Sequence, residues 1–326
     1  MQDSLSIFNF KMQYRKFTIR LVVFLFIIFA FDLMMGNVLE FLFFKQKTGP
    51  NYQIIESITT NSADLVVLGN SRAQHHYNPK IISNKTGFSC VNSGLNGGYG
   101  IYLPAFQIEE MANHYSPKLI IVEVDPNGLG YWKGNYDRLS VLMPFIDRYP
   151  KAYDYIMLRD NYQKIKLFSK SYKYNSLVYN ELMYSLFFNK FAHVKSFIPN
   201  YKIMTQKDSI VKEELTNISN SIGLDINMEN ILLHLISFSK ENKIKLVFVN
   251  SPIYNNTAKD KYSFAGKKTI QILKDNNICF WDYSNDTTFL NKYYLFSDRL
   301  HLNDKGAELY SNMIADRLIG EGIIKN

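Results

Sequence analysis

The stretch that decides the fold is Asp64–Asn78, which reads DLVVLGNSRAQHHYN. Its apolar run, Leu65–Leu68, has β-branched residues at its centre and is closed by Gly69. Such a run predicts a strand that is buried on both faces, as the strands of a parallel sheet are. The glycine permits a tight turn, so Ser71 should emerge just beyond the carboxyl end of the strand, where open α/β sheets place their chemistry. Ser71 is therefore a candidate nucleophile, and a structural turn serine is the commoner alternative.

A second stretch, Ser297–Asn303 (SDRLHLN), precedes the region expected to form the C-terminal helix. Asp298 and His301 are three residues apart, so a single turn can bring the carboxylate to one imidazole nitrogen. The other nitrogen is then free to take a proton from Ser71. The alternative is that Asp298 and His301 only cap the helix. Asn303 is the better N-cap residue, however, which frees Asp298 for another role.

Together, these stretches resemble the first and last motif blocks of the SGNH/GDSL hydrolases. Between them, Asn92–Gly97 (NSGLNG) resembles the glycine block of that family. The resemblance covers the order and spacing of the blocks from about residue 64 to the C-terminus, but not the middle third of the chain. It implies a serine hydrolase acting on ester bonds, with Ser71 as the nucleophile, His301 as its base and Asp298 holding the imidazole tautomer.

The same resemblance implies an oxyanion hole made by the backbone N–H groups of Ser71 and Gly94 and by one side-chain amide. The family usually has an Asn-Asp pair after the third strand, preceded by glycine, whereas this chain has Asp125-Pro126-Asn127. Asn127 is therefore the expected amide donor, with Asn96 in reserve. Either asparagine could instead be a turn residue.

The fold class follows from the alternation of strand and helix patterns. The chain has 326 residues, of which 47% are hydrophobic and 20% charged, enough for one large or two small domains. After Leu119–Val124, strand patterns recur at Lys245–Asn250 and Ile278–Tyr283, with helical spacing between them. We expect a flavodoxin-like, three-layer α/β/α sandwich with a parallel sheet. An α/β-hydrolase is less suitable, because its Gly-x-Ser-x-Gly elbow needs glycine where Ala73 stands.

The N-terminal region has the pattern of a membrane anchor. Residues 1–20 carry four basic residues against one acid, and an unbroken apolar run follows from Leu21 to Phe31. About 20 residues from Leu21 can cross a bilayer, with Asp32 and Glu40 close to the outer interface. A signal peptide and a buried core helix are the alternatives. The basic flank, and the lack of a small-x-small cleavage pattern after the run, favour an anchor with its N-terminus in the cytoplasm.

The expected domain organisation follows from that anchor. Residues 1–44 are expected to form a cytoplasmic tail and a single transmembrane helix, and residues 45–63 a linker with a short amphipathic piece. Residues 64–326 are expected to form the SGNH hydrolase-like domain outside the cytoplasm. In a Gram-negative bacterium, that arrangement places the anchor in the inner membrane and the domain in the periplasm.

The segment 131–227 interrupts the α/β pattern where a connection would normally be short. It holds 11 of the 23 tyrosines, and its part between Lys151 and Lys212 has 11 basic and 4 acidic residues. Most of the formal net charge of +8 therefore lies here. We expect a mostly helical insertion over the carboxyl edge of the sheet. Its tyrosines either pack within a solvated subdomain or stack on sugar rings, and its lysines could attract an acidic polymer or anionic lipid.

Three functional classes remain open. The first is an esterase that removes acyl groups, with acetyl as the expected group, from a cell-envelope or extracellular glycan. The second is an O-acyltransferase that passes the acyl group to a sugar hydroxyl with the same triad. The third is a non-enzymatic envelope protein that binds or assembles.

No nucleic-acid motif, cofactor motif or His/Cys cluster with metal-ligand spacing is present. Cys90 and Cys279 are expected to be unpaired rather than joined in a disulfide.

Overall fold

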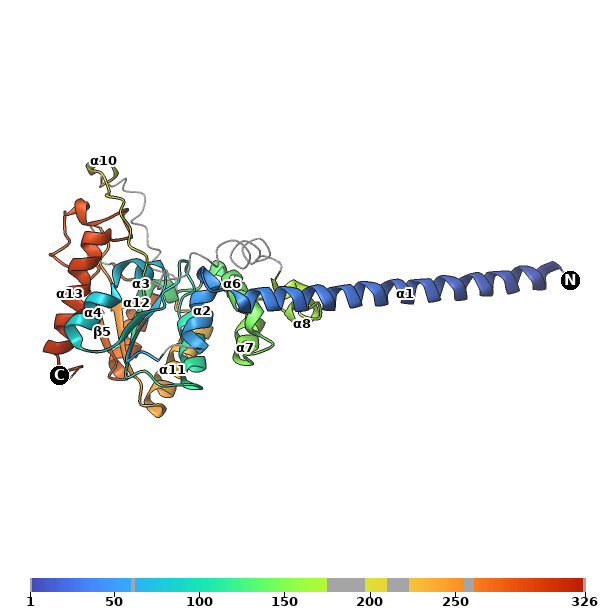
Figure 1. Ribbon diagram of the computed structural model, residues 1–326, viewed down its shortest axis with the longest axis horizontal. Coiled ribbons are helices and arrows are strands. Elements are labelled where there is room, and N and C mark those ends of the chain that lie inside the picture. Colours follow the sequence, from blue (N-terminus) through green and yellow to red (C-terminus); the bar gives the residue numbers. More distant parts are fainter. Residues whose placement is uncertain (1, 60–61, 175–196, 210–222, 255–260, 325–326) are drawn as a thin grey trace.

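The computed structural model describes residues 2–59, 62–174, 197–209, 223–254 and 261–324 (Figure 1). Its centre is a five-stranded sheet in the order β2-β1-β3-β4-β5, and every neighbouring pair is parallel. The strands are β1 (Leu65–Gly69), β2 (Cys90–Asn92), β3 (Leu119–Glu123), β4 (Lys245–Asn250) and β5 (Cys279–Asp282). This all-parallel sheet confirms the predicted α/β fold class.

The register of the central strands aligns their carboxyl ends. Gly69 of β1 pairs with Glu123 of β3, and Glu123 pairs with Val249 of β4. All five residues of β1 are buried, as are all five of β3, which explains why both read as continuous apolar runs. The loops that follow β1, β3 and β4 therefore meet at one edge of the sheet.

Helices cover both faces of the sheet. Alternate residues of each strand point to opposite faces, so each strand contributes apolar side chains to both helix layers. Leu65 and Val67 belong to the core shared with α3 (Ser71–His76), α4 (Pro79–Thr86) and α13 (Asp304–Gly320). Val66 and Leu68 belong to the core on the other face. The helices of that second layer are α2 (Pro50–Thr59), α5 (Tyr102–Ala112), α11 (Ile226–Glu241) and α12 (Phe264–Asp275).

The segment expected to be a linker contributes a helix to this second layer. In α2, Ile54 and Ile58 are fully buried and the helix packs against α5. The Gln53 side chain accepts a hydrogen bond of 3.2 Å from Gln74 on α3. The amphipathic piece within residues 45–63 is therefore part of the folded domain and not an exposed stalk.

The N-terminal helix α1 (Gln2–Lys45) projects far from the rest of the molecule (Figure 1). Among the described residues, one helical segment, Gln13–Lys45, is both long enough and apolar enough to cross a membrane. Its C-terminal part contacts the domain, and Leu39 and Phe43 are buried there. The chain thus has one apolar N-terminal helix of spanning length, as the sequence predicts.

The described parts of the insertion are mostly helical, with an irregular stretch at 197–205, but most do not cover the carboxyl edge of the sheet. They pack against α1, α5 and one another, and Tyr136, Tyr155 and Tyr174 are buried there. Residues 175–196 and 210–222 lie outside the described residues. The described helices are α6 (Lys133–Arg138), η2 (Leu139–Phe145), α7 (Lys151–Met157), α8 (Gln163–Lys166), η3 (Ser171–Tyr174) and α10 (Gln206–Ser209).

The two cysteines lie on strands at opposite edges of the sheet. Cys90 begins β2, Cys279 begins β5, and both thiols are free. This confirms the prediction that they are unpaired.

Candidate active site

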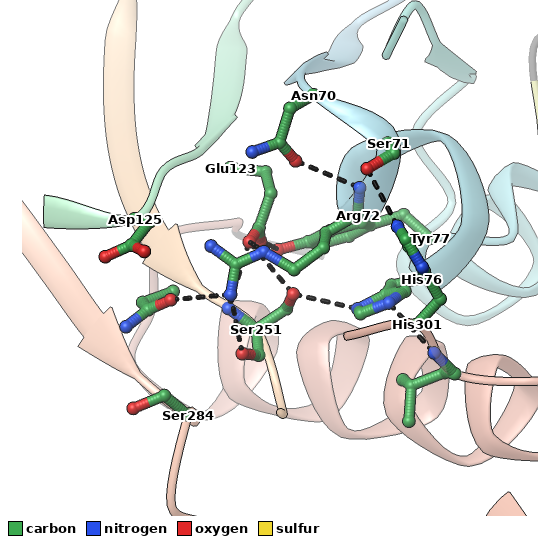
Figure 2. Close-up of polar contacts among 12 residues, drawn as sticks. Asn70, Ser71, Arg72, His76, Tyr77, Glu123, Asp125, Ser251, Ser284 and His301 are labelled. Atoms are coloured by element: carbon green, nitrogen blue, oxygen red, sulfur yellow. Dashed lines mark hydrogen bonds and ion pairs between the residues drawn. The ribbon is translucent and has the colours of Figure 1, made fainter. Parts of the chain in front are cut away.

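Ser71 is the first residue of α3 and lies directly beyond the carboxyl end of β1 (Figure 2). The turn depends on Gly69, whose φ is +140° and where a Cβ would lie 2.6 Å from the carbonyl oxygen of Glu123. Asn70 caps the helix, since its Oδ1 accepts a hydrogen bond of 2.9 Å from the N–H of Arg72. Together, the glycine turn and the asparagine cap fix where the Ser71 hydroxyl points.

The structure brings Ser71, His301 and Asp298 into one hydrogen-bonded line. Ser71 Oγ lies 2.8 Å from His301 Nε2. His301 Nδ1 lies 2.9 Å from each carboxylate oxygen of Asp298. Asp298 Oδ1 also accepts from the backbone N–H groups of Leu300 at 2.8 Å and His301 at 3.0 Å.

These contacts determine where the protons lie. Burial acts to raise the pKa of Asp298, but the hydrogen bonds from His301 and from the backbone outweigh it, so the pKa is lowered. An ionised Asp298 can only accept, so His301 Nδ1 carries a hydrogen. His301 Nε2 is then an acceptor for the Ser71 hydroxyl, which is the tautomer that a general base needs.

The loop that carries His301 is held at both ends. The N–H of Ser297 donates to the carbonyl of His301 at 2.8 Å, and Phe296 forms an antiparallel bridge with Leu302. Asn303 is the N-cap of α13, where its Oδ1 accepts from the N–H of Gly306 at 3.0 Å. The structure thus confirms Asn303 as the cap, and Asp298 is engaged with His301 instead.

Beneath this loop, a chain of hydrogen bonds has only one possible direction (Figure 2). The N–H of Leu302 donates to His76 Nε2 at 3.0 Å. His76 Nδ1 must then carry the hydrogen and donate to Ser251 Oγ, 2.8 Å away. Ser251 Oγ in turn donates to Glu123 Oε1 at 2.9 Å. Complete burial lowers the pKa of His76 far below its usual range, which keeps the ring neutral as this chain requires.

This series of hydrogen bonds ends at a buried ion pair between Glu123 and Arg72, the residue after Ser71. Arg72 Nε lies 3.2 Å from Glu123 Oε1, and Arg72 Nη1 donates to Asn250 Oδ1 at 2.9 Å. Burial raises the pKa of Glu123, yet its partners Arg72, Tyr77 and Ser251 are all donors, the surroundings of an ionised carboxylate. Glu123 is therefore the ion-pair partner of Arg72. Sequence reasoning missed Ser251, whose only signal is its place directly after a buried strand.

His75 lies on the other side of His301. Its ring meets the His301 ring edge to face, with centroids 5.5 Å apart. His75 Nδ1 lies 2.8 Å from the carbonyl oxygen of Ile198, which it can only meet as a donor. Ile198 belongs to the end of the insertion, so the returning stretch 197–204 runs beside the triad. His75 thus flanks the site and His76 packs beneath it.

The expected oxyanion donors are largely occupied by structural roles. The N–H of Gly94 donates to Asn92 Oδ1 at 2.9 Å, so it is not free to bind an oxyanion. A Cβ on Gly94 would lie 2.5 Å from the Cβ of Ala73, so this glycine serves close packing against α3. In the described part of this loop, the backbone N–H groups of Asn96, Gly97 and Gly98 make no hydrogen bond to the protein. Gly94 is therefore a correction to the sequence prediction.

The side-chain amides of Asn127 and Asn96, the two candidate oxyanion donors, differ in their hydrogen bonds. Asn127 Nδ2 donates to the carbonyl of Lys261 at 2.8 Å, and its Oδ1 accepts from the N–H of Ser263 at 2.8 Å. Asn127 therefore fastens the start of α12 and keeps one amide hydrogen for another acceptor. Asn96 is exposed, and its side chain has no hydrogen bond among the described residues.

A cavity of about 440 Å³ lies at the carboxyl edge of the sheet, and Asn70, which precedes Ser71 in the chain, forms part of its lining. Tyr131 and Trp132 form part of its wall and are 64% and 52% exposed. The polar side chains that line it are Asn70, Glu123, Asp125, Asn127 and Asn135. Within the described ranges, no group of three or more His, Cys, Asp or Glu side chains is arranged to hold a metal ion.

Comparison with known proteins gives only distant similarities. No family model matches the chain, and no curated protein matches it. An acetyl xylan esterase structure has a TM-score of 0.39 and 12% identity, over 79% of this chain and 98% of that one. A structure assigned to the G-D-S-L family of lipolytic proteins, from Desulfitobacterium hafniense, has a TM-score of 0.38 and 11% identity, over 77% and 97%. A structure assigned as an acylhydrolase, from Bacteroides fragilis, has a TM-score of 0.38 and 13% identity, over 79% of this chain and 86% of that one.

Proposed function

We propose that this protein is a serine esterase of the SGNH/GDSL type. The observation that carries the proposal is the hydrogen-bonded line from Ser71 through His301 to Asp298, at the carboxyl edge of a parallel sheet and beside a cavity. Nucleophile, base and orienting acid are all within hydrogen-bond distance, and the third group fixes the tautomer of the second. This is the arrangement that activates a serine hydroxyl.

In the proposed reaction, Ser71 Oγ attacks the ester carbonyl carbon while His301 Nε2 takes its proton. Asp298 stabilises the imidazolium that results. The tetrahedral intermediate collapses, and His301 gives the proton to the departing alcohol, which leaves an acyl group on Ser71. A water molecule then attacks the acyl group, with His301 again as base. The acid leaves and the Ser71 hydroxyl is restored.

The oxyanion of each intermediate needs donors that are in place beforehand. We assign the backbone N–H of Ser71, the backbone N–H of Gly97 and the remaining amide hydrogen of Asn127. The first lies at the start of α3, and the second is one of three backbone N–H groups, at positions 96–98, that make no hydrogen bond to the described part of the protein. Asn127 lines the cavity, and its contacts with Lys261 and Ser263 would hold its amide in a fixed orientation.

For the substrate, we propose an acylated glycan of the cell envelope, with acetyl as the acyl group. The cavity beside Ser71 combines exposed aromatic rings at Tyr131 and Trp132 with several amide side chains. Aromatic faces stack on the apolar faces of sugar rings, and amides bond to their hydroxyl groups. This combination supports a saccharide as the part of the substrate next to the ester.

We further propose that α1 anchors the enzyme in the inner membrane, with its N-terminus in the cytoplasm and residues 64–326 in the periplasm. The support is the spanning length of Gln13–Lys45 and the basic residues Arg15, Lys16 and Arg20 before the apolar run. An envelope glycan would be within reach of a domain tethered in this way.

The test is turnover of p-nitrophenyl acetate by the full chain and by its Ser71→Ala variant. We expect hydrolysis by the native chain and almost none by the variant. Slow turnover that accelerates when a glycan acceptor is added would make the protein an O-acyltransferase instead. Lack of any Ser71-dependent turnover with several acyl donors would contradict the enzymatic proposal and leave a binding or assembly role.

A further inference from the structure

Three large apolar side chains are exposed on and around the short helix α8. Tyr162, Ile165 and Phe168 are 67%, 74% and 77% exposed. Single exposed apolar residues are normal on protein surfaces, but three within seven residues form a patch that needs a partner. The residues between them include Lys164 and Lys166, and Lys166 Nζ lies 2.8 Å from the carboxylate of Asp160.

This patch is fixed to one level of α1. The hydroxyl of Ser169 and the N–H of Lys170 each donate to the Asp32 carboxylate at 2.7 Å, and the Ser171 hydroxyl donates to it as well. The ring of Phe168 lies 5.9 Å from that of Phe29 on α1. Figure 1 shows α8 beside α1, at the point where the helix leaves the domain.

The level of that attachment can be compared with the thickness of a bilayer. About 20 helical residues are needed to cross a hydrocarbon core of roughly 30 Å, so a span that begins at Leu21 reaches about Glu40. Asp32 comes eight residues before Glu40, which corresponds to roughly 12 Å along the helix at about 1.5 Å per residue. The segment that holds Asp32 therefore lies at or below the outer boundary of the membrane.

The surface of α1 itself is consistent with that depth. Beyond Asp32, the side of α1 that does not face the domain still exposes Met34, Val38 and Phe41, which are 57%, 49% and 62% exposed. The apolar surface of the anchor is thus continuous past the level at which α8 is attached. Lipid that covers these side chains would also surround the patch on α8.

We propose that residues 160–170 lie in the outer leaflet of the membrane, with Tyr162, Ile165 and Phe168 among the lipid chains. Lys164 reaches the phosphate groups, as lysines at membrane interfaces do, while Lys166 stays paired with Asp160. The inference rests on the proposal that α1 crosses a membrane, and it does not depend on the esterase activity. Two attachments, the helix and the patch, then hold the domain in one orientation on the bilayer.

The experiment measures the depth of single labelled positions in the full chain. An environment-sensitive fluorophore is attached to Ile165→Cys and, separately, to Phe168→Cys, and each protein is reconstituted in phosphatidylethanolamine–phosphatidylglycerol vesicles. Some of the lipid carries bromine on its acyl chains, which quenches a nearby fluorophore. Phe24→Cys, on the exposed part of α1, is the control within the span. Leu309→Cys, exposed on α13 at the far end of the molecule, is the aqueous control (Figure 1).

We expect quenching at positions 165 and 168 close to that at position 24, and no quenching at 309. The unsubstituted chain gives the background from Cys90 and Cys279. Quenching at 24 with none at 165 and 168 would overturn the placement of α8 but leave the anchor in place. No quenching at position 24 would overturn both the anchor and the inference that rests on it, while turnover by Ser71 would remain a separate result.

Discussion

Ser71 and His301 share one proton across a contact of 2.8 Å, so neither should work without the other. We expect Ser71→Ala and His301→Ala each to remove nearly all turnover of p-nitrophenyl acetate, and the double variant to be little worse than either. Asp298→Asn should be milder or comparable, because it damages only the tautomer and the stabilisation of imidazolium. If His301→Ala keeps the wild-type kcat, His301 is not the catalytic base and the stretch before α13 serves only to cap that helix.

A second prediction separates the two candidate amides. Asn127→Ala should lower kcat by about 10²–10³ if Asn127 donates to the oxyanion. It should also lower the thermal stability, because the start of α12 loses the hydrogen bonds to Lys261 and Ser263. Asn96→Ala is the matched control and should change neither quantity, since the Asn96 side chain is exposed. If Asn127→Ala leaves kcat unchanged and Asn96→Ala lowers it strongly, Asn96 and not Asn127 is the oxyanion donor.

At the level of single residues, the sequence predicts the triad contacts better than the oxyanion donors. Asp298 and His301 are close in the chain, and each motif stands at the end of a recognisable element. By contrast, the N–H of Gly94 is taken by Asn92, and Asn127 is bound by Lys261. Neither partner can be deduced from local spacing, because side-chain amides choose partners from loops that only the folded chain brings together.

His76 links three elements, α3, the end of β4 and the loop that carries His301. We expect His76→Ala to lower kcat with little change in KM, because Leu302 loses its acceptor and Ser251 its donor. Leaving these buried groups unpaired should cost about 1–3 kcal/mol of the free energy of unfolding. Thermal unfolding and steady-state kinetics measure the two effects. Unchanged kcat would show that the loop does not need this support.

The same residue predicts a dependence of stability on pH. The pKa of His76 is lowered in the folded protein, so below its ordinary value of 6.5 only the unfolded chain binds the proton. Its contribution to stability is therefore full above that pH and is lost as the pH falls. Unfolding scans between pH 5 and pH 7 should show a smaller slope in His76→Ala than in the native chain.

At the level of elements, the periodicity of the sequence predicts the sheet, but it indicates α2 only as a short amphipathic piece of an expected linker. Strands β1 and β3 are visible because both are buried along their whole length. The α2 segment instead has Gly49-Pro50 before it and polar residues around it, which suggest a linker. Its isoleucines at positions 54, 55 and 58 are nevertheless buried against α5. Such a short amphipathic helix is recognisable only when the surface that it covers is known.

For the molecule as a whole, the proposed topology makes a direct prediction. A reporter enzyme fused after residue 50 should be active only if it requires the environment outside the cytoplasm, because the basic residues before Leu21 keep the N-terminus inside. Paired fusions to alkaline phosphatase and to a cytoplasmic reporter measure this. An active cytoplasmic reporter at this position would contradict both the localisation and the glycan substrate.

The basic insertion shows why composition alone could not assign a partner. Its excess of lysine and its tyrosines suggested a lid for an acidic glycan, and the sequence could not tell which face it covers. In the described part, Tyr136, Tyr155 and Tyr174 are buried, Tyr131 lines the cavity, and α8 lies beside α1 (Figure 1). Burial and position relative to the anchor, which the sequence does not contain, therefore favour lipid as the partner of α8, while the first residues of the insertion face the proposed glycan site.

The central claim is that Ser71 is an activated nucleophile, and covalent labelling tests it without knowledge of the substrate. The full chain is treated with a fluorophosphonate, which reacts with activated serines, and the modified residue is identified by mass spectrometry of the peptides. We predict one adduct on Ser71, strongly reduced labelling in His301→Ala and none in Ser71→Ala. An unmodified Ser71 in the folded native chain, or equal labelling when His301 is replaced, would contradict the account.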